Sequence, residues 1–171
     1  SNLAKRDFTI NAMALPLADS LLSDWKAKII DPLGGRKDLD NRVLRAVSDS
    51  VFNDDPLRLI RAARFALKYG LKISKETLEL VDCLEGIDVR RVAPERVRDE
   101  FMQILSLPNS YRVVVCLDRE LRCLDLFFPE IKGMKGVEQG PYHNFDVWEH
   151  CLETLRHFEN NVQNLGLDFS Q

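Results

Sequence analysis

The sequence predicts a mainly α-helical protein with a small β portion at its N-terminal end. From Asp55 onward, apolar residues recur with helical spacing nearly everywhere. Strand character is confined to residues 1–48, and proline and glycine mark the boundaries between segments. At 171 residues the chain can bury a real core and could form one or two domains.

The composition excludes several classes of protein. A formal net charge of −3 is not that of a general nucleic-acid binder, so any contact with an anionic ligand must come from local patches. No apolar run approaches the roughly 18 residues needed to span a membrane, and no secretory signal is visible, so we expect no membrane partner and a cytoplasmic protein. The oligomeric state stays open. The cysteines lack metal-site spacing and are expected to be free thiols in a reducing compartment: Cys83, Cys116, Cys123 and Cys151.

Three short strands are expected in the N-terminal region. Residues 11–17 and 27–31 are short and apolar-rich, and residues 42–47 alternate between polar and apolar side chains. The run Asp-Pro-Leu-Gly-Gly at residues 31–35 is a strong turn signal. Asp31 is as compatible with a turn-forming role as with a functional carboxylate.

A basic helix is expected within residues 53–68, starting near Asp55 and Pro56. It has a carboxylate before a first-turn proline, and Gly70 suits its C-terminal cap. Four cations lie within an arc of roughly 120° on its surface, and apolar residues occupy most of the other side. We call these four the arginine face: Arg58, Arg61, Arg64 and Lys68. This face suits a polyanion such as a triphosphate. It could also be an ordinary solvated surface in which Asp54 and Arg58 form an i,i+4 pair.

Further helices follow. Ser74 is a good N-cap for one helix, and Pro94 begins another that runs through Leu105. Two more are expected over residues 109–117 and 119–128, the second ended by Pro129. Residues 132–141 contain three glycines and are the best linker candidate, and a last amphipathic helix is expected over residues 146–160.

Three motifs occur in a fixed order. They are Arg6-Asp7-Phe8-Thr9-Ile10-Asn11-Ala12-Met13-Ala14, then Asp31-Pro32-Leu33-Gly34-Gly35-Arg36-Lys37-Asp38-Leu39, then the basic helix. Together they strongly resemble the bacterial tRNA nucleotidyltransferase and poly(A) polymerase family, the CCA-adding enzymes. The similarity continues through residues 93–97 and 126–131 and so covers most of the chain.

The resemblance implies three parts of the chain. Residues 1–48 would be the C-terminal part of a nucleotidyltransferase head domain, with its short strands and a glycine hinge. Residues 49–131 would form a helical neck and body that recognise the nucleotide and bind RNA. Residues 132–171 would be a linker and the first helix of a possible His-Asp phosphohydrolase domain.

The resemblance also implies a set of nucleotide-binding residues: Arg6, Asn11, Asp55, Arg58, Arg61 and Arg64. Asp55 and Arg58 would read the base edge of CTP or ATP, while Arg6, Arg61 and Arg64 would hold the nucleotide and its phosphates. Asn11 would lie in the same pocket, although asparagine also often satisfies its own backbone in a turn. The family usually has glutamate where this chain has Asp54, which puts any contact of that side chain in doubt.

The family's chemistry needs Mg²⁺ held by an Asp-x-Asp pair. That pair is expected before Arg6, outside this chain, so we predict no catalytic residue here and an inactive chain on its own. Asp38 and Asp40 have the same spacing but follow the hinge glycines, and they are read as helix or turn acids.

The segment from Tyr142 to His150 resembles the opening of the His-Asp phosphohydrolase domain. His150 matches the first metal ligand of that domain, and Asp146 and His157 lie within about 40° of it on a helical wheel. A lone histidine with a carboxylate one turn away is also a common surface pair. We expect no bound metal in this chain.

The leading functional hypothesis is part of a template-independent RNA nucleotidyltransferase. The parent would add CMP or AMP from CTP or ATP to an RNA 3′ end, most simply that of tRNA. A poly(A) polymerase has nearly the same motifs. Two alternatives lack this chemistry: a nucleotide-binding module of a phosphohydrolase, and an RNA-binding adaptor. The adaptor would use a basic patch that alternates with acids and could equally be a solvated mixed surface: Arg90, Arg91, Arg96 and Arg98.

Overall fold

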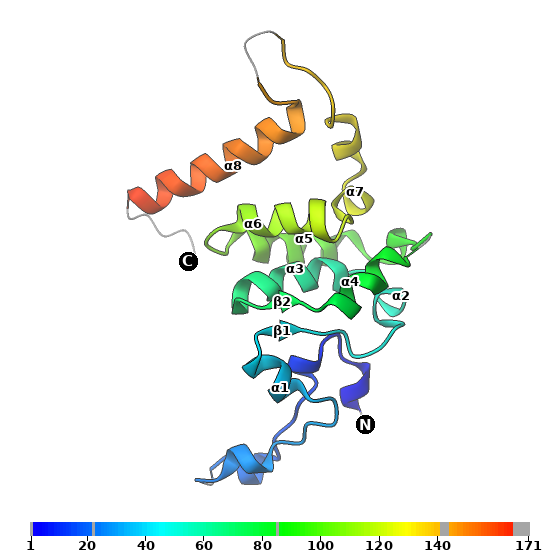
Figure 1. Cartoon of the computed structure of the whole chain (residues 1–171), viewed down its shortest axis with the longest axis vertical. Coiled ribbons are helices and arrows are strands. Elements are labelled where there is room, and N and C mark those ends of the chain that lie inside the picture. The colour runs from blue at the N-terminus through cyan, green and yellow to red at the C-terminus, as the bar shows by residue number, and fades with distance from the viewer. Residues whose placement is uncertain (1, 22, 85, 141–143, 166–171) are drawn as a thin grey trace.

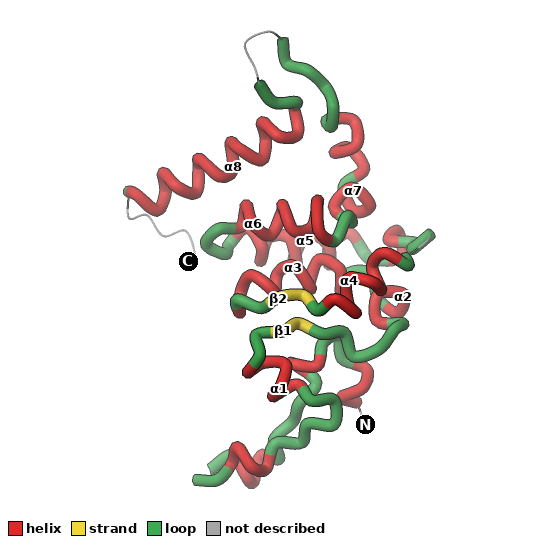
Figure 2. The backbone as a smooth tube through the Cα atoms, in the orientation of Figure 1, coloured by secondary structure: helices red, strands yellow, loops and turns green. Residues whose placement is uncertain are grey.

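A computed structural model describes residues 2–21, 23–84, 86–140 and 144–165. It is mainly helical, with one small parallel sheet between the N-terminal segments and the helical layers (Figure 1, Figure 2). In chain order the helices are α1 (Gly35–Asp40), α2 (Val51–Asp54), α3 (Arg58–Tyr69), α4 (Lys75–Asp82), α5 (Pro94–Leu105), α6 (Ser110–Val115), α7 (Leu124–Phe127) and α8 (Val147–Asn164); the strands are β1 (Val43–Leu44) and β2 (Lys72–Ile73). No helix among these residues is long and apolar enough to cross a bilayer.

Helix α3 lies at the centre of the molecule and packs against α5, α6 and both strands (Figure 1). Its apolar side supplies much of the core, including Leu59, Ile60 and Ala62, which are almost fully buried. This burial fixes the helix, because apolar surface removed from water stabilises the fold by about 25 cal/mol per Å². The polar side of α3 is therefore held in a defined orientation.

The expected N-terminal strands are mostly wrong. Residues 11–17 and 27–31 meet only at one antiparallel bridge, between Ala14 and Ile30. Short 3-10 helices occupy most of the flanking chain, at Thr9–Asn11, Leu17–Asp19 and Trp25–Lys28. Apolar residues alone do not make a strand, because a strand also needs a neighbour along its length to pair its backbone groups.

The third expected strand, over residues 42–47, is confirmed only as the two-residue β1. Its partner is β2, which sequence reasoning did not predict. The two strands are parallel, with Val43 opposite Lys72 and Leu44 opposite Ile73. This pairing joins the predicted head segment to the chain beyond α3. The predicted domain boundaries at residues 48 and 131 stay predictions.

Local signals located several helix ends correctly. Gly70 closes α3 with a φ of 61°, and the amide of Leu71 donates back to the carbonyl of Ala66 at 2.8 Å. The Ser74 hydroxyl accepts from the Thr77 amide at 3.2 Å and caps α4. The helix predicted from Pro94 is confirmed as α5, and α8 begins after Asp146 and extends to Asn164, four residues beyond the predicted end.

The predicted helix over residues 119–128 is wrong in its extent. Helix α6 continues into a π-helical turn at Cys116–Glu120, and Arg122 then adopts a φ of 45°, in the left-handed region. That conformation breaks the helix, so only Leu124–Phe127 remains as α7. Helix α7 does end just before Pro129, as predicted, and a separate 3-10 helix follows at Pro129–Gly133.

The turn at residues 31–35 positions α1. Both Asp31 oxygens accept backbone amides, from Gly35 at 2.7 Å and from Arg36 at 2.9 Å, so Asp31 caps the helix. Gly34 has a φ of 74° and uses the backbone freedom expected of glycine. Gly35 is required for a different reason: a Cβ there would lie 2.8 Å from the carbonyl carbon of Thr9 and closer still to its oxygen.

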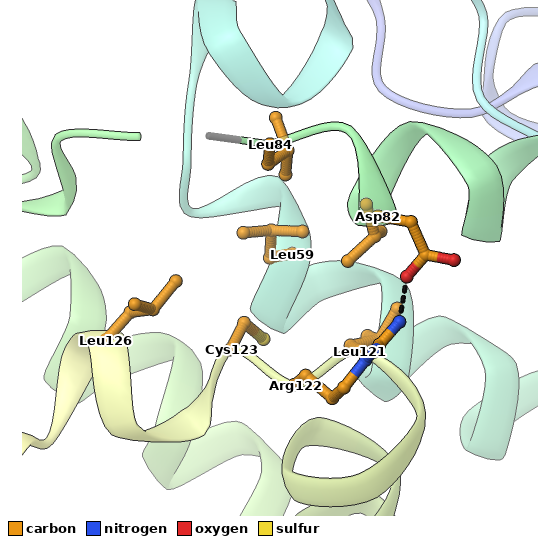
Figure 3. Close-up of a pocket in the computed structure, with 8 residues that line it drawn as sticks. Leu59, Asp82, Leu84, Leu121, Arg122, Cys123 and Leu126 are labelled. Carbon is orange, nitrogen blue, oxygen red and sulfur yellow. Dashed lines mark hydrogen bonds and ion pairs between the residues drawn. The ribbon is translucent and has the colours of Figure 1, made fainter. Parts of the chain in front are cut away.

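A pocket of about 410 Å³ opens beside α3 and α4 (Figure 3). Several leucines line it, and an ion pair between Asp82 and Arg122 lies at its edge. Cys123 lines it and is buried, and burial raises the pKa of that thiol. Cys116 is half-buried, and burial raises its pKa to about 12. All four cysteines are free, as predicted.

Candidate nucleotide-binding site

Arg58 forms hydrogen bonds to two segments outside α3. It lies at the start of α3, and its guanidinium donates to the carbonyl of Val51 in α2 at 3.2 Å and to the carbonyl of Lys5 at 2.9 Å. A guanidinium has five N–H donors in a rigid plane. Two are used to fix the orientation of the group, and the others remain available to a ligand.

Arg61 is fixed by a buried carboxylate from the N-terminal segment. Its Nε donates to Asp7 Oδ2 at 2.6 Å, and Asn11 Nδ2 donates to the other oxygen of Asp7 at 2.7 Å. Burial alone would raise the pKa of Asp7, but the hydrogen bond and charge of Arg61, with the bond from Asn11, hold it below its ordinary value. The Asn11 amide oxygen also accepts from the Phe8 amide at 3.3 Å, so the turn-forming role is present.

Arg64 is buried, with 7% of its surface exposed. Its Nε donates to Glu100 of α5, and the second oxygen of Glu100 lies 3.7 Å from Arg61 Nη1. Both guanidiniums also stack near the ring of Phe65, at 5.2 Å for Arg61 and 4.6 Å for Arg64. The arginine face is therefore only partly open, because Glu100 and Asp7 already pair with its two central members.

Asp55 and Arg58 lie close in sequence, but each has another partner. Asp55 Oδ2 accepts from Arg96 of α5 at 2.6 Å, and Oδ1 accepts from the Leu57 amide at 3.2 Å. Asp54 accepts from the Ser50 hydroxyl at 3.0 Å, and no ion pair among the described residues joins it to Arg58. The simple i,i+4 interpretation of Asp54 and Arg58 is therefore wrong.

The remaining cations of this region are exposed. Arg6 immediately precedes Asp7, and within the described part of the chain it has no ion-pair partner. Lys68 lies over the ring of Tyr69, 5.7 Å from its centroid.

Sequence reasoning missed two functional candidates, Asp7 and Glu100. Asp7 lies within the first motif but was given no role, and Glu100 lies on α5, one helical turn after Arg96. These two α5 residues contact Asp55 and the α3 arginines respectively. The i,i+4 spacing of Arg96 and Glu100 places them on one face of the helix. Only the packing of α5 shows which residues that face contacts.

The described residues do not assemble a metal site. No group of three or more His, Cys, Asp or Glu side chains that could hold an ion occurs among them. Both oxygens of Asp146 accept backbone amides, from Glu149 at 2.7 Å and from Gly136 at 2.7 Å, so Asp146 caps α8. Tyr142 and His143 of the expected phosphohydrolase motif lie outside the described residues.

The Asp-x-Asp spacing at residues 38 and 40 belongs to α1, as expected for helix acids. Asp38 is buried and accepts from the Thr9 hydroxyl at 2.7 Å and from Arg45 Nε at 3.3 Å. The basic patch near α5 is a mixed surface in part, because Arg90 pairs with Asp88 and Arg98 with Asp99, at 2.8 and 2.7 Å.

Comparison with known proteins matches two parts of the chain to described families. Residues 1–45 match the poly A polymerase head domain, and residues 70–134 match the probable RNA and SrmB-binding site of polymerase A. An A-adding tRNA nucleotidyltransferase from Deinococcus radiodurans is 39% identical over 158 residues, which cover 90% of this chain and 34% of that protein. A multifunctional CCA protein from Neisseria gonorrhoeae is 39% identical over 158 residues, covering 91% and 36%. The chain thus spans about a third of the length of these curated relatives.

Solved structures agree with this assignment. A tRNA-processing enzyme in an apo form superposes with a TM-score of 0.72 at 28% identity, covering 99% of this chain and 43% of that one. A CCA-adding enzyme solved with ATP and with CTP gives a TM-score of 0.66 at 27% identity, with 99% of this chain covered and 37% and 36% of those chains. With both family matches in the expected order and the arginine helix between them, the chain belongs to the family of tRNA nucleotidyltransferases and poly(A) polymerases.

Proposed function

We propose that the protein acts as a template-independent RNA nucleotidyltransferase that adds CMP or AMP, from CTP or ATP, to the 3′ end of tRNA. This chain would supply nucleotide recognition. The observation that carries the proposal is the fixed donor and acceptor set around α3, where Arg58 and Arg61 are each oriented by partners from separate segments. Such preorganisation favours binding, because less side-chain freedom is lost when the ligand arrives.

Base selection is assigned to Asp55 and Arg58. Cytosine and adenine both present an exocyclic amino group, which a carboxylate can accept, beside a ring nitrogen that a guanidinium can contact. Uracil presents a carbonyl oxygen where cytosine has its amino group, so an ionised Asp55 would face a second acceptor. The bond from Arg96 fixes the plane of the Asp55 carboxylate.

Phosphate binding is assigned to Arg6, Arg61 and Arg64, with Asn11 in the same pocket. Arg6 is exposed and can move to the triphosphate, whereas Arg61 can use only the N–H groups that Asp7 and Glu100 leave unbound. Buried Arg64 would contribute mainly positive charge. Asn11 can offer a ligand only the amide N–H and the oxygen lone pair that its bonds to Asp7 and Phe8 leave unused.

The family's transfer chemistry uses Mg²⁺ to activate the attacking hydroxyl and to stabilise the leaving pyrophosphate. We assign to this chain the recognition and positioning of the nucleotide. The cytoplasm, where tRNA is processed in bacteria, is the compartment we expect.

Competition incorporation by the full-length protein tests base selection. With CTP and UTP present together, Asp55→Ala should lower the preference for CTP more than it lowers total incorporation, since it removes the acceptor and leaves the phosphate contacts. Asp99→Ala is a matched control, because Asp99 is an exposed carboxylate that pairs with Arg98. An unchanged preference in Asp55→Ala would refute the base-reading role.

Equilibrium binding of CTP tests the arginine face. Arg58→Ala and Arg61→Ala should each weaken binding about tenfold or more, because a charge-assisted hydrogen bond contributes about 1.5–3 kcal/mol. Arg98→Ala removes an exposed arginine elsewhere and should leave the affinity unchanged. Equal affinities in the wild type and both α3 variants would contradict the assignment.

A further inference from the structure

A second basic site lies on the opposite side of α3 from the arginine face. It is a cavity of about 620 Å³ between α3, β2 and α6, within the size range of ligand pockets. Its apolar walls come largely from α3 and α6: Ala63, Ala66, Leu67, Leu71, Ile73, Val113 and Cys116. Lys72 and Arg112 also line it, one from the strand and one from the helix.

A third cation borders the same cavity. The Lys72 amide donates to the carbonyl of Arg42 at 2.8 Å, and Arg42 Nη1 donates to the carbonyl of Tyr69 at 3.0 Å. Arg42 also lies 3.9 Å from the position a Cβ would take on Gly70, a lining residue. Arg42 thus caps the end of α3, while Lys72 and Arg112 remain for other contacts.

The cations of this site have no ion-pair partner among the described residues. None of its three cations forms an ion pair there, whereas neighbouring cations do: Arg45 pairs with Glu76 at 2.9 Å and Lys75 with Glu79 at 3.4 Å. Glu120 is the single acid among the lining residues. Two exposed cations beside an apolar wall form a surface that attracts a phosphate with an apolar group attached to it.

We propose that this cavity binds the RNA strand, with backbone phosphates on Lys72 and Arg112 and a base or ribose against the apolar wall. The choice of RNA as the occupant rests on the proposed function and on the family match of residues 70–134. These residues include both cations, and the matched family is described as a probable RNA-binding site. The site is separate from the nucleotide face, since the two lie on opposite sides of a helix about 10 Å across.

The experiment measures binding of a labelled single-stranded RNA of 12 nucleotides by fluorescence polarisation over a series of salt concentrations. Lys72→Glu/Arg112→Glu should weaken binding at least tenfold at low salt and lower the slope of log affinity against log salt by about 1.4, because two phosphate contacts are lost. The charge-conserving pair Lys72→Arg/Arg112→Lys should bind close to wild type. Circular dichroism confirms that each variant is folded.

Arg90→Glu/Arg98→Glu is the matched control, with the same change of net charge on another surface, and it should bind RNA much more tightly than the cavity variant. Equal weakening in both pairs would show only an effect of net charge and would overturn the proposal, as would weakening confined to the control. CTP binding should be unchanged in the cavity variant; if it falls equally, the cavity holds free nucleotide rather than RNA. If Arg61→Ala leaves the CTP affinity intact, the proposed nucleotide site is wrong. The RNA site is still supported in that case when the cavity variant loses RNA binding, so the two proposals fail independently.

Discussion

Each arginine at the centre of the proposed site is already bonded before a ligand arrives. Arg61 lies between Asp7 and Glu100, and Arg64 is buried against Glu100. A carboxylate that pairs with an arginine fixes its plane and lowers its freedom, and the unused N–H groups then point in set directions. The geometry of this site therefore depends on two acids that are themselves inaccessible to solvent.

The first prediction concerns Glu100. Glu100→Gln removes the negative charge between Arg64 and Arg61 and leaves a buried guanidinium without its counterion. Breaking a buried pair in this way costs about 3–5 kcal/mol, so we expect a loss of that order in the free energy of unfolding from urea titration. Asp99→Asn, at the neighbouring exposed carboxylate, should change it by less than about 0.5 kcal/mol. Similar values for both variants would contradict a structural role for the buried pair.

The second prediction concerns the protonation of Asp7. Its pKa in the folded chain is lowered from an ordinary value of 3.8, so its stabilising effect is complete above that value. It is lost as the pH falls through the lower pKa of the folded state, because the unfolded chain then binds the proton first. Free energies of unfolding between pH 5 and pH 2 should fall less steeply in Asp7→Asn than in the wild type. Parallel curves would show that Asp7 does not have a depressed pKa.

At the scale of elements, the turn into α1 illustrates close backbone packing. In Gly35→Ala, the added Cβ would overlap the backbone of Thr9, which cannot move aside as a flexible side chain could. We expect a loss of about 1–3 kcal/mol in stability, measured by thermal unfolding. Gly133→Ala is the control, because no atom lies within 4 Å of its added Cβ and its φ is not positive. If the two variants unfold at the same temperature, the close approach at Gly35 carries no cost.

Helices were predictable where their signals are local. Gly70, Ser74 and Pro94 mark helix ends by their own chemistry, and α3 and α5 lie where the sequence placed them. The strands were not predictable, because β1 is two residues long and pairs with β2 across the whole of α3. The break at Arg122 also has no local signal, since a non-glycine residue with positive φ is set by its surroundings.

The candidate site likewise has a part that the sequence predicts and a part that it does not. The arginine face follows from helical spacing within one element, and the resemblance supplied roles for its members. The partners of these residues come from distant segments: Asp7 is 54 positions from Arg61, and Glu100 is 36 positions from Arg64. Such pairs depend on how α5 and the N-terminal segment pack, which no pattern within a single segment records.

At the scale of the whole molecule, α8 lies beside α6 and is attached at two separated points (Figure 1). Near its start, Trp148 Nε1 donates to Asp118 at 3.0 Å. Near its end, Glu159 accepts from the Ser110 hydroxyl and from the Tyr111 amide at 3.3 Å. Asn109 provides no side-chain cap for α6, so Glu159 of α8 supplies the cap from another helix.

This arrangement makes the start of α6 and the end of α8 depend on each other. Glu159→Ala removes the cap, which contributes about 0.5–2 kcal/mol in helices generally. Hydrogen exchange should become faster at the amides of residues 110–112 and 155–164 and stay unchanged in α3, which is held by the core. Glu153→Ala is the control, because Glu153 forms its ion pairs with Arg156 and His157 of the same helix. Equal exchange at residues 110–112 in the two variants would show that α8 does not cap α6.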